Sequence, residues 1–154
     1  MPPVDPRVIQ LRVVVEAEDF EQALAFYRDA LGLPEQAAFE AEGDARVVIL
    51  DAGRATLELA NPAQRAMIDR LEVGRPTTPK IRLAFEVADA ATTTGTLVAA
   101  GAELVAGPVE TPWRSLNARL DAPAGLQITI FEELESLEER TAQPGFGEAD
   151  RPQP

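Results

Sequence analysis

The sequence predicts an α+β fold made of two similar units in tandem, and three observations lead to this prediction. Each half of the chain combines strand-like segments with one segment of helical spacing. The second half repeats the first at an offset of about 70 residues, which indicates an internal duplication. One face of each predicted strand is apolar, as expected for a sheet covered by helices.

The first unit is expected over residues 8–60, after a loose, proline-rich leader of residues 1–7. A helix is predicted from Asp19, which is placed to cap it, to Gly32, which ends it. Strands are expected at residues 8–15, 46–50 and 55–60, and the segment 36–43 has room for another.

The connection between the units is expected at residues 61–79, where residues 62–71 have the pattern of a short helix. After the second unit, residues 134–154 are predicted to form an acidic helix and a flexible tail. The acidic run is more typical of a solvated surface than of a binding segment.

The second unit is expected over residues 80–133. Its first segment, residues 80–89, corresponds to residues 10–19 and carries Arg, Glu and Asp at matching places. The helix that follows ends at Gly101, as the earlier helix ends at a glycine. Several such matches in one order are unlikely to arise by chance, so we interpret them as one structural unit used twice.

Composition limits the function classes. The 154 residues include 26 Asp and Glu against 14 Lys and Arg, a net charge of −12. This charge repels phosphate, so we expect neither a nucleic acid nor an anionic membrane as a partner. The absence of cysteine and histidine excludes disulfides, thiolate and imidazole catalysis, and metal sites that need these ligands. Without an apolar span or a signal peptide, we expect a cytoplasmic location.

Side-chain parity divides every predicted strand into two faces. The apolar face is expected to pack on the helices. The other face mixes polar and apolar groups, which suits either a solvent-exposed face or a partly enclosed pocket. The apolar set is Leu11, Val13, Val15, Val48, Leu50, Leu57, Leu59, Leu83, Phe85, Val87, Ala118, Leu120, Ile128 and Ile130.

Two motifs resemble a known superfamily. Residues 15–33 read VEAEDFEQALAFYRDALGL, and residues 120–131 read LDAPAGLQITIF. Over residues 8–133, the chain resembles the vicinal oxygen chelate superfamily of glyoxalase I, extradiol dioxygenases, and fosfomycin- and bleomycin-resistance proteins. The resemblance implies two tandem βαβββ modules that form a curved mixed sheet, or cup, with helices on its outer face. It also implies a homodimer and a cup lined by the mixed face.

Metal enzymes of this superfamily place their ligands on the first and last strands of each module. The matching positions here hold Arg12, Glu58, Arg82 and Thr129. Of these, Glu58 is a good metal ligand, whereas the two arginines would repel a cation. We therefore expect no metal and no other cofactor.

If these positions converge, two guanidiniums and one carboxylate meet, and Arg119 can join them. The group could be a structural ion pair, or a spare guanidinium could bind a carboxylate, phosphate or phenolate. Trp113 could stack on a planar ligand at the rim or cover the core. The predicted ligand-binding residues are Arg12, Glu58, Arg82, Trp113, Asn117, Arg119 and Thr129.

The sequence is compatible with three functions. The first is a metal-free, bleomycin-resistance-like homodimer that sequesters a small aromatic or anionic molecule; the acidic surface would suit an antibiotic with cationic parts. The second is a metal-independent isomerase, epimerase or lyase with Glu58 as the catalytic general base, although flanking arginines would weaken that base. The third is a partner-binding module whose cup is filled by its own side chains.

Overall fold

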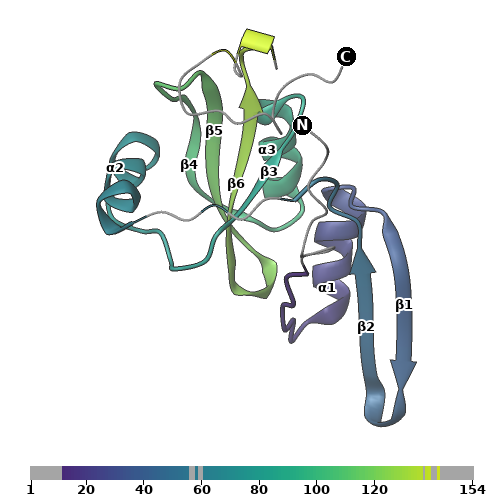
Figure 1. Ribbon diagram of the computed structural model, residues 1–154. Helices are drawn as coiled ribbons and strands as arrows, with labels where there is room; N and C mark the ends of the chain where they lie inside the picture. The colour runs from purple at the N-terminus through teal and green to yellow at the C-terminus, as the bar shows by residue number, and fades with distance from the viewer. Residues whose placement is uncertain (1–11, 56–57, 59–60, 137, 140–141, 143–154) are drawn as a thin grey trace, which may run out of the picture.

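The computed structural model describes residues 12–55, 58, 61–136, 138–139 and 142, and its second half contains a four-stranded sheet (Figure 1). The strand order is β3-β6-β5-β4, with β3 parallel to β6 and the other pairs antiparallel. A helix follows the first strand, so the element order is β-α-β-β-β. The elements are β3 (Leu83–Glu86), α3 (Ala90–Ala99), β4 (Glu103–Glu110), β5 (Ser115–Ala122) and β6 (Leu126–Glu133).

The core lies between this sheet and α3, which covers one face of it (Figure 1). Leu97 of α3 is fully buried, and Phe26 from the first half of the chain joins the same cluster. The predicted apolar face of the sheet is thus confirmed in the second unit, where burial of these side chains is the main stabilising effect. The buried sheet residues are Ala118, Leu120, Ile128 and Ile130, with Leu83, Phe85 and Val87 packed against them.

The two predicted helices begin at matching caps. Asp19 accepts a hydrogen bond from the backbone of Gln22, and Asp89 accepts one from the backbone of Thr92, each at 3.0 Å. The first helix comprises α1 (Phe20–Leu24) and a π-helical continuation (Ala25–Ala30). Each helix is followed by a glycine with positive φ, Gly32 or Gly101, which relieves the steric cost of the turn.

The first half also contains a hairpin of β1 (Glu35–Ala41) and β2 (Ala45–Leu50), which projects away from the four-stranded sheet (Figure 1). It confirms the strand predicted at 46–50 and the additional strand suggested for 36–43. The strand predicted at 8–15 differs: residues 12–17 are neither helix nor strand, and residues 8–11 lie outside the described residues.

Two further expectations for the first unit are not met by the described residues. Ala55 and Glu58 are not in a strand, and the other residues of the predicted strand 55–60 lie outside the described part. The side chains of Val13 and Val15, expected to face the helices, are 56% and 38% exposed. That expectation was wrong because no described strand pairs with residues 12–17 to hold these side chains over a core.

The connector contains the predicted helix, α2 (Pro62–Glu72), with Asn61 as its cap. Pro62 suits the first helical position, where its missing N–H is not needed. This helix lies beside β5. Within the described residues, no helix has the length and apolar character needed to cross a membrane.

Tyr27 links the two halves. Its hydroxyl donates a 2.8 Å hydrogen bond to the carbonyl of Pro123 in the β5–β6 turn, and its ring packs edge-on against Phe26. Burial raises the pKa of Tyr27 to about 12. These contacts agree with a packing role for this tyrosine. The α+β fold class is confirmed, while the domain boundaries themselves stay predictions.

Candidate functional site

The mixed face of the second sheet brings four of the predicted site residues together. Arg119 on β5 stands directly opposite Thr129 on β6, and Ala84 on β3 is paired with Thr129 from the other side. Arg82, two residues before Ala84, lies on the same face and donates a hydrogen bond from Nη1 to Thr129 Oγ1. Asn117 lies two residues before Arg119 on that face.

Arg119 is fully buried and is held by two carboxylates from α2. Its Nη2 lies 2.5 Å from Glu72 Oε2, and its Nη1 lies 3.5 Å from Asp69 Oδ1. Its Nη1 also donates hydrogen bonds to the side chains of Thr78, at 2.7 Å, and Gln127, at 3.0 Å. A guanidinium can be buried at moderate cost only when it is paired in this way.

Arg119 thus takes part in an ion pair within the protein, which is one of the two interpretations that the sequence left open for this group. Asp69 and Glu72 were not predicted as site residues. Their separation of three positions places both on one side of α2, which the sequence does indicate. What it does not indicate is that this side of the helix lies over β5, because that contact joins residues 47 positions apart.

Asn117 is tied into the same buried network. Its Nδ2 donates to Glu72 Oε1 at 2.6 Å, and its Oδ1 accepts a hydrogen bond from Ser115 Oγ at 2.6 Å. The Ser115 and Thr111 hydroxyls lie 2.8 Å apart. Polar groups therefore satisfy one another from the end of β4 to α2, as buried polar groups must.

Asp69 fixes the chain that follows α2. Its carboxylate accepts hydrogen bonds from the backbone N–H groups of Thr77, at 3.1 Å, and Thr78, at 3.3 Å, and from the Thr78 hydroxyl. Burial alone would raise the pKa of Asp69, but these hydrogen bonds and the charge of Arg119 outweigh it and lower that pKa. Asp69 therefore stays ionised and holds residues 77–78 close to Arg119.

Arg82 differs from Arg119 because, in the part of the chain that the structure describes, no carboxylate forms an ion pair with it. Within the described residues, its guanidinium forms a hydrogen bond to Thr129 only, and its buried Nε has no partner. Burial lowers the pKa of Arg82, and the charge of Arg119 lowers it further; Glu72, Glu58 and Asp69 act in the opposite direction. The Nε of Arg119 is also buried without a partner in this part of the chain.

The other three predicted site residues are exposed. Glu58 is exposed, yet its charge acts on Arg82, which places the two in the same neighbourhood. Arg12 is exposed in the segment without regular structure. Trp113 is 37% exposed in the turn between β4 and β5, so it does not cover the core completely. The binding roles of all seven residues stay predictions.

A divalent metal does not fit the residues at the positions where the related metal enzymes carry ligands. Arg12, Glu58, Arg82 and Thr129 offer one carboxylate and one hydroxyl against two guanidiniums, a set that repels a cation. Among the described residues, no three His, Cys, Asp or Glu side chains are grouped to hold an ion.

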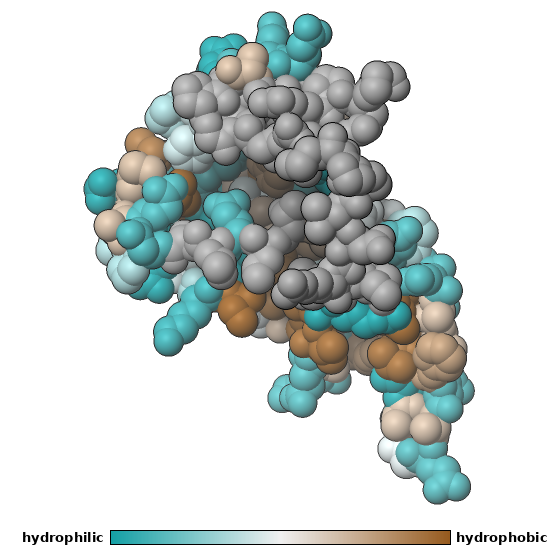
Figure 2. Space-filling model, in the orientation of Figure 1, coloured by the Kyte–Doolittle hydropathy of each residue, from teal (hydrophilic) through white to brown (hydrophobic). Residues whose placement is uncertain are grey.

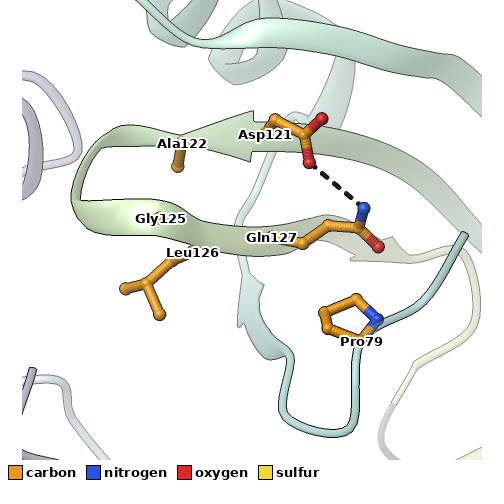
Figure 3. A pocket seen from close by; sticks show the side chains of 6 residues that line it. All are labelled: Pro79, Asp121, Ala122, Gly125, Leu126 and Gln127. Carbon is orange, nitrogen blue, oxygen red and sulfur yellow. Dashed lines mark hydrogen bonds between the residues drawn. The ribbon is translucent and has the colours of Figure 1, made fainter.

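A shallow pocket of about 310 Å³ lies at the β5–β6 turn, next to the network rather than on it (Figure 3). Gln127 connects the two, because its Nε2 donates to Asp121 Oδ1 at 3.1 Å while its Oε1 accepts from Arg119. Figure 3 shows Pro79, from the connector, on the same side of the pocket as Gln127. The pocket has an acidic edge and holds none of the predicted ligand-binding residues. It is lined by Pro79, Asp121, Ala122, Gly125, Leu126 and Gln127.

The described surface also exposes apolar side chains. In Figure 2, brown residues gather where the projecting hairpin meets the rest of the molecule. Phe39 and Val47, on the hairpin, are 60% and 46% exposed. Arg46 holds the hairpin to α1, with its guanidinium over the Phe20 ring and its Nη1 2.5 Å from Glu21 Oε1.

Comparisons with known proteins identify the class. A family model described as a glyoxalase-like domain matches residues 12–131, so the chain belongs to the glyoxalase-like domain family. This result confirms the resemblance to the vicinal oxygen chelate superfamily. No curated protein matches the chain.

Solved structures agree at the level of the fold. A member of the glyoxalase/bleomycin resistance protein/dioxygenase superfamily from Sphaerobacter thermophilus DSM 20745 is 23% identical, with a TM-score of 0.51, over 78% of this chain and 92% of that one. A glyoxalase-related enzyme from Fulvimarina pelagi is 19% identical, with a TM-score of 0.50, over 82% and 89%. A glyoxalase family protein from Bacillus cereus is 16% identical, with a TM-score of 0.50, over 83% and 99%.

Proposed function

We propose that this protein is a metal-free binder of a small aromatic acid or phenol, which it holds on the mixed face of the second sheet. The observation that carries the proposal is the incomplete hydrogen bonding of the Arg82 guanidinium. An arginine has five N–H donors, and in the described residues this one donates only to the Thr129 hydroxyl while its buried Nε has no acceptor. A carboxylate or phenolate oxygen would supply the missing acceptor.

The contrast with Arg119 supports Arg82 as the anchor. Both guanidinium ends of Arg119 are occupied by protein groups, with Glu72 on Nη2 and Thr78 and Gln127 on Nη1. A ligand would have to displace these groups to reach Arg119, whereas no carboxylate of the described residues would have to leave Arg82. Buried polar groups without a partner are costly, so a ligand oxygen on Arg82 gains a strong hydrogen bond at little expense.

The aromatic part of the proposal rests on the neighbouring side chains. Phe131 follows Thr129 by two positions on β6 and stands opposite Asn117, so it lies on the same face. It is partly buried, and Ala84 on β3 is exposed beside Thr129. Apolar groups beside a cation are the usual lining of a site for an aromatic acid.

The experiment is a calorimetric titration of the purified protein with benzoate, at a pH near 7. Replacing Arg82→Gln should weaken binding by about tenfold to a hundredfold, the range for a hydrogen bond to a charged group. Arg75→Gln is the matched control, because Arg75 is exposed in the connector and the same charge is removed. Equal benzoate affinity in wild type and Arg82→Gln would contradict the proposal.

The proposal extends to the oligomeric state, the location and the kind of ligand. We infer a homodimer, supported by the exposed apolar side chains of the hairpin, and a cytoplasmic location. Sequestration of an antibiotic with cationic parts would be consistent with the net charge of −12. The alternative enzyme would use Glu58 as its base; it is distinguished by Glu58→Gln, which would then abolish turnover of a substrate while leaving its affinity unchanged.

A further inference from the structure

Two arginines of the mixed face and two carboxylates of α2 lie close enough for their charges to act on one another. Arg119 contacts Glu72 and Asp69, and Arg82 stands across Thr129 from Arg119. Two positive and two negative charges cancel, so these four groups together are neutral. The carboxylate of Glu58 adds a further negative charge on the Arg82 side.

This balance limits the ligand that Arg82 can accept. A ligand with one negative charge brings the net charge of the four groups to −1, or to −2 with Glu58 included, and it gains a direct hydrogen bond to the Arg82 guanidinium. A second negative charge would have to face Glu72 and Asp69 without a free cation, since both guanidinium ends of Arg119 are already engaged. Like charges in a partly buried site repel strongly, because the effective dielectric is well below that of water.

We propose that Glu72 and Asp69 of α2 determine the charge of the ligand, so that the site selects a monoanion and rejects a dianion. This inference rests on the proposed function and deepens it, because it adds the class of ligand. Glu72 acts through Arg119: it neutralises the guanidinium that could otherwise hold a second carboxylate. It is therefore a specificity-determining residue without direct contact with the first anionic group.

The test compares benzoate with isophthalate, which at pH 7 has one and two carboxylates of similar geometry. Wild type should bind benzoate at least about tenfold more tightly than isophthalate, the effect expected for one additional charge repelled within about 10 Å. In Glu72→Gln the preference should narrow or reverse, with an affinity gain of about tenfold for isophthalate and little change for benzoate. The glutamine keeps an oxygen for Asn117 and the shape of the side chain.

A matched control and a second variant make the result specific. Glu42→Gln removes the same charge from the exposed turn of the hairpin and should leave the ratio of the two affinities unchanged. Asp69→Asn should shift the ratio in the same direction as Glu72→Gln but less, because its carboxylate is 3.5 Å from Arg119 rather than 2.5 Å.

The outcomes separate the two proposals. Equal binding of benzoate and isophthalate by wild type would overturn the charge selection and leave the benzoate site standing. Binding of isophthalate by Glu72→Gln alone would support the charge selection. Failure of both proteins to bind either acid would overturn both proposals. The wild-type comparison needs no variant, so the inference can be refuted even if Glu72→Gln does not fold.

Discussion

The second module and the first contain related sequences but differ in what covers their strands. In residues 80–133, four strands and α3 enclose a core in which Leu97, Leu120 and Ile128 are fully buried. In the described part of the first module, the hairpin forms a two-stranded sheet of its own, and Val13 and Val47 are 56% and 46% exposed. A two-stranded hairpin alone is marginally stable in water, whereas a helix-covered sheet of four strands is not.

The difference teaches that a repeated pattern predicts which faces are apolar but not which faces become buried. Burial needs a partner strand on each side and a helix above, and in the second module the parallel β3–β6 pair supplies the link. The first helix packs into that same core through Phe26. The second module thus serves as the scaffold for both the core and the candidate site.

The largest effect should come from truncating a buried side chain in the core of the second module. Leu120→Ala should lower the free energy of unfolding by about 3–5 kcal/mol, because it leaves a cavity in a fully buried position. Val47→Ala on the hairpin should cost at most about 1 kcal/mol, since that side chain is already 46% exposed. Urea unfolding measures both. Similar losses at the two positions would mean that the hairpin is buried in solution and would remove the contrast.

The next effect concerns the ion pair that connects α2 to the sheet. Glu72→Ala should cost about 2–3 kcal/mol, because Arg119 stays fully buried and retains only the weaker Asp69 contact and its hydrogen bonds. Glu42→Ala, in the exposed hairpin turn, should change stability by less than about 0.5 kcal/mol. Thermal unfolding of the two variants measures both losses of stability. A loss below about 1 kcal/mol for Glu72→Ala would show that α2 does not cover Arg119.

A smaller effect tests the caps that the repeat places at matching positions. Asp89→Ala should cost about 1–2 kcal/mol, since this carboxylate accepts from both the backbone and the hydroxyl of Thr92. Asp19→Ala should cost about 0.5–1 kcal/mol, because within the described residues the Asp19 side chain accepts one hydrogen bond, from the backbone of Gln22. Chemical denaturation of the two variants at the same pH compares their free energies of unfolding. A larger loss for Asp19→Ala than for Asp89→Ala would contradict the stronger cap in the second module.

The smallest effect tests the link between the two halves. Tyr27→Phe removes the hydrogen bond to Pro123 and should cost about 1 kcal/mol at neutral pH. The pKa of Tyr27 is raised to about 12 in the folded state, so the protonated phenol stabilises the fold below about pH 10, and this contribution is lost as the pH rises from 10 towards 12. Stability measured from pH 8 to pH 11.5 should fall less steeply in the variant. Parallel curves would contradict the buried phenol.

Local features were predictable from the sequence, and contacts between distant segments were not. The helix at residues 90–99, its cap at Asp89 and the apolar face with Leu120 follow from periodicity and composition, which act over a few residues. The pairing of Arg119 with Glu72 depends on where a connector helix settles, and no periodic signal encodes that. For the same reason, parity placed Val13 on a buried face although its segment finds no described partner strand.

We expect an anionic oxygen of the ligand to bind Arg82 on the mixed face of the second sheet. A crystal structure with bromobenzoate tests it most directly, because the bromine locates the ligand without ambiguity. We expect the carboxylate within hydrogen-bond distance of Arg82 Nε, with the ring towards Phe131 and the Glu72–Arg119 pair intact. Bromobenzoate bound at the β5–β6 turn instead, with Arg82 untouched, would contradict the claim.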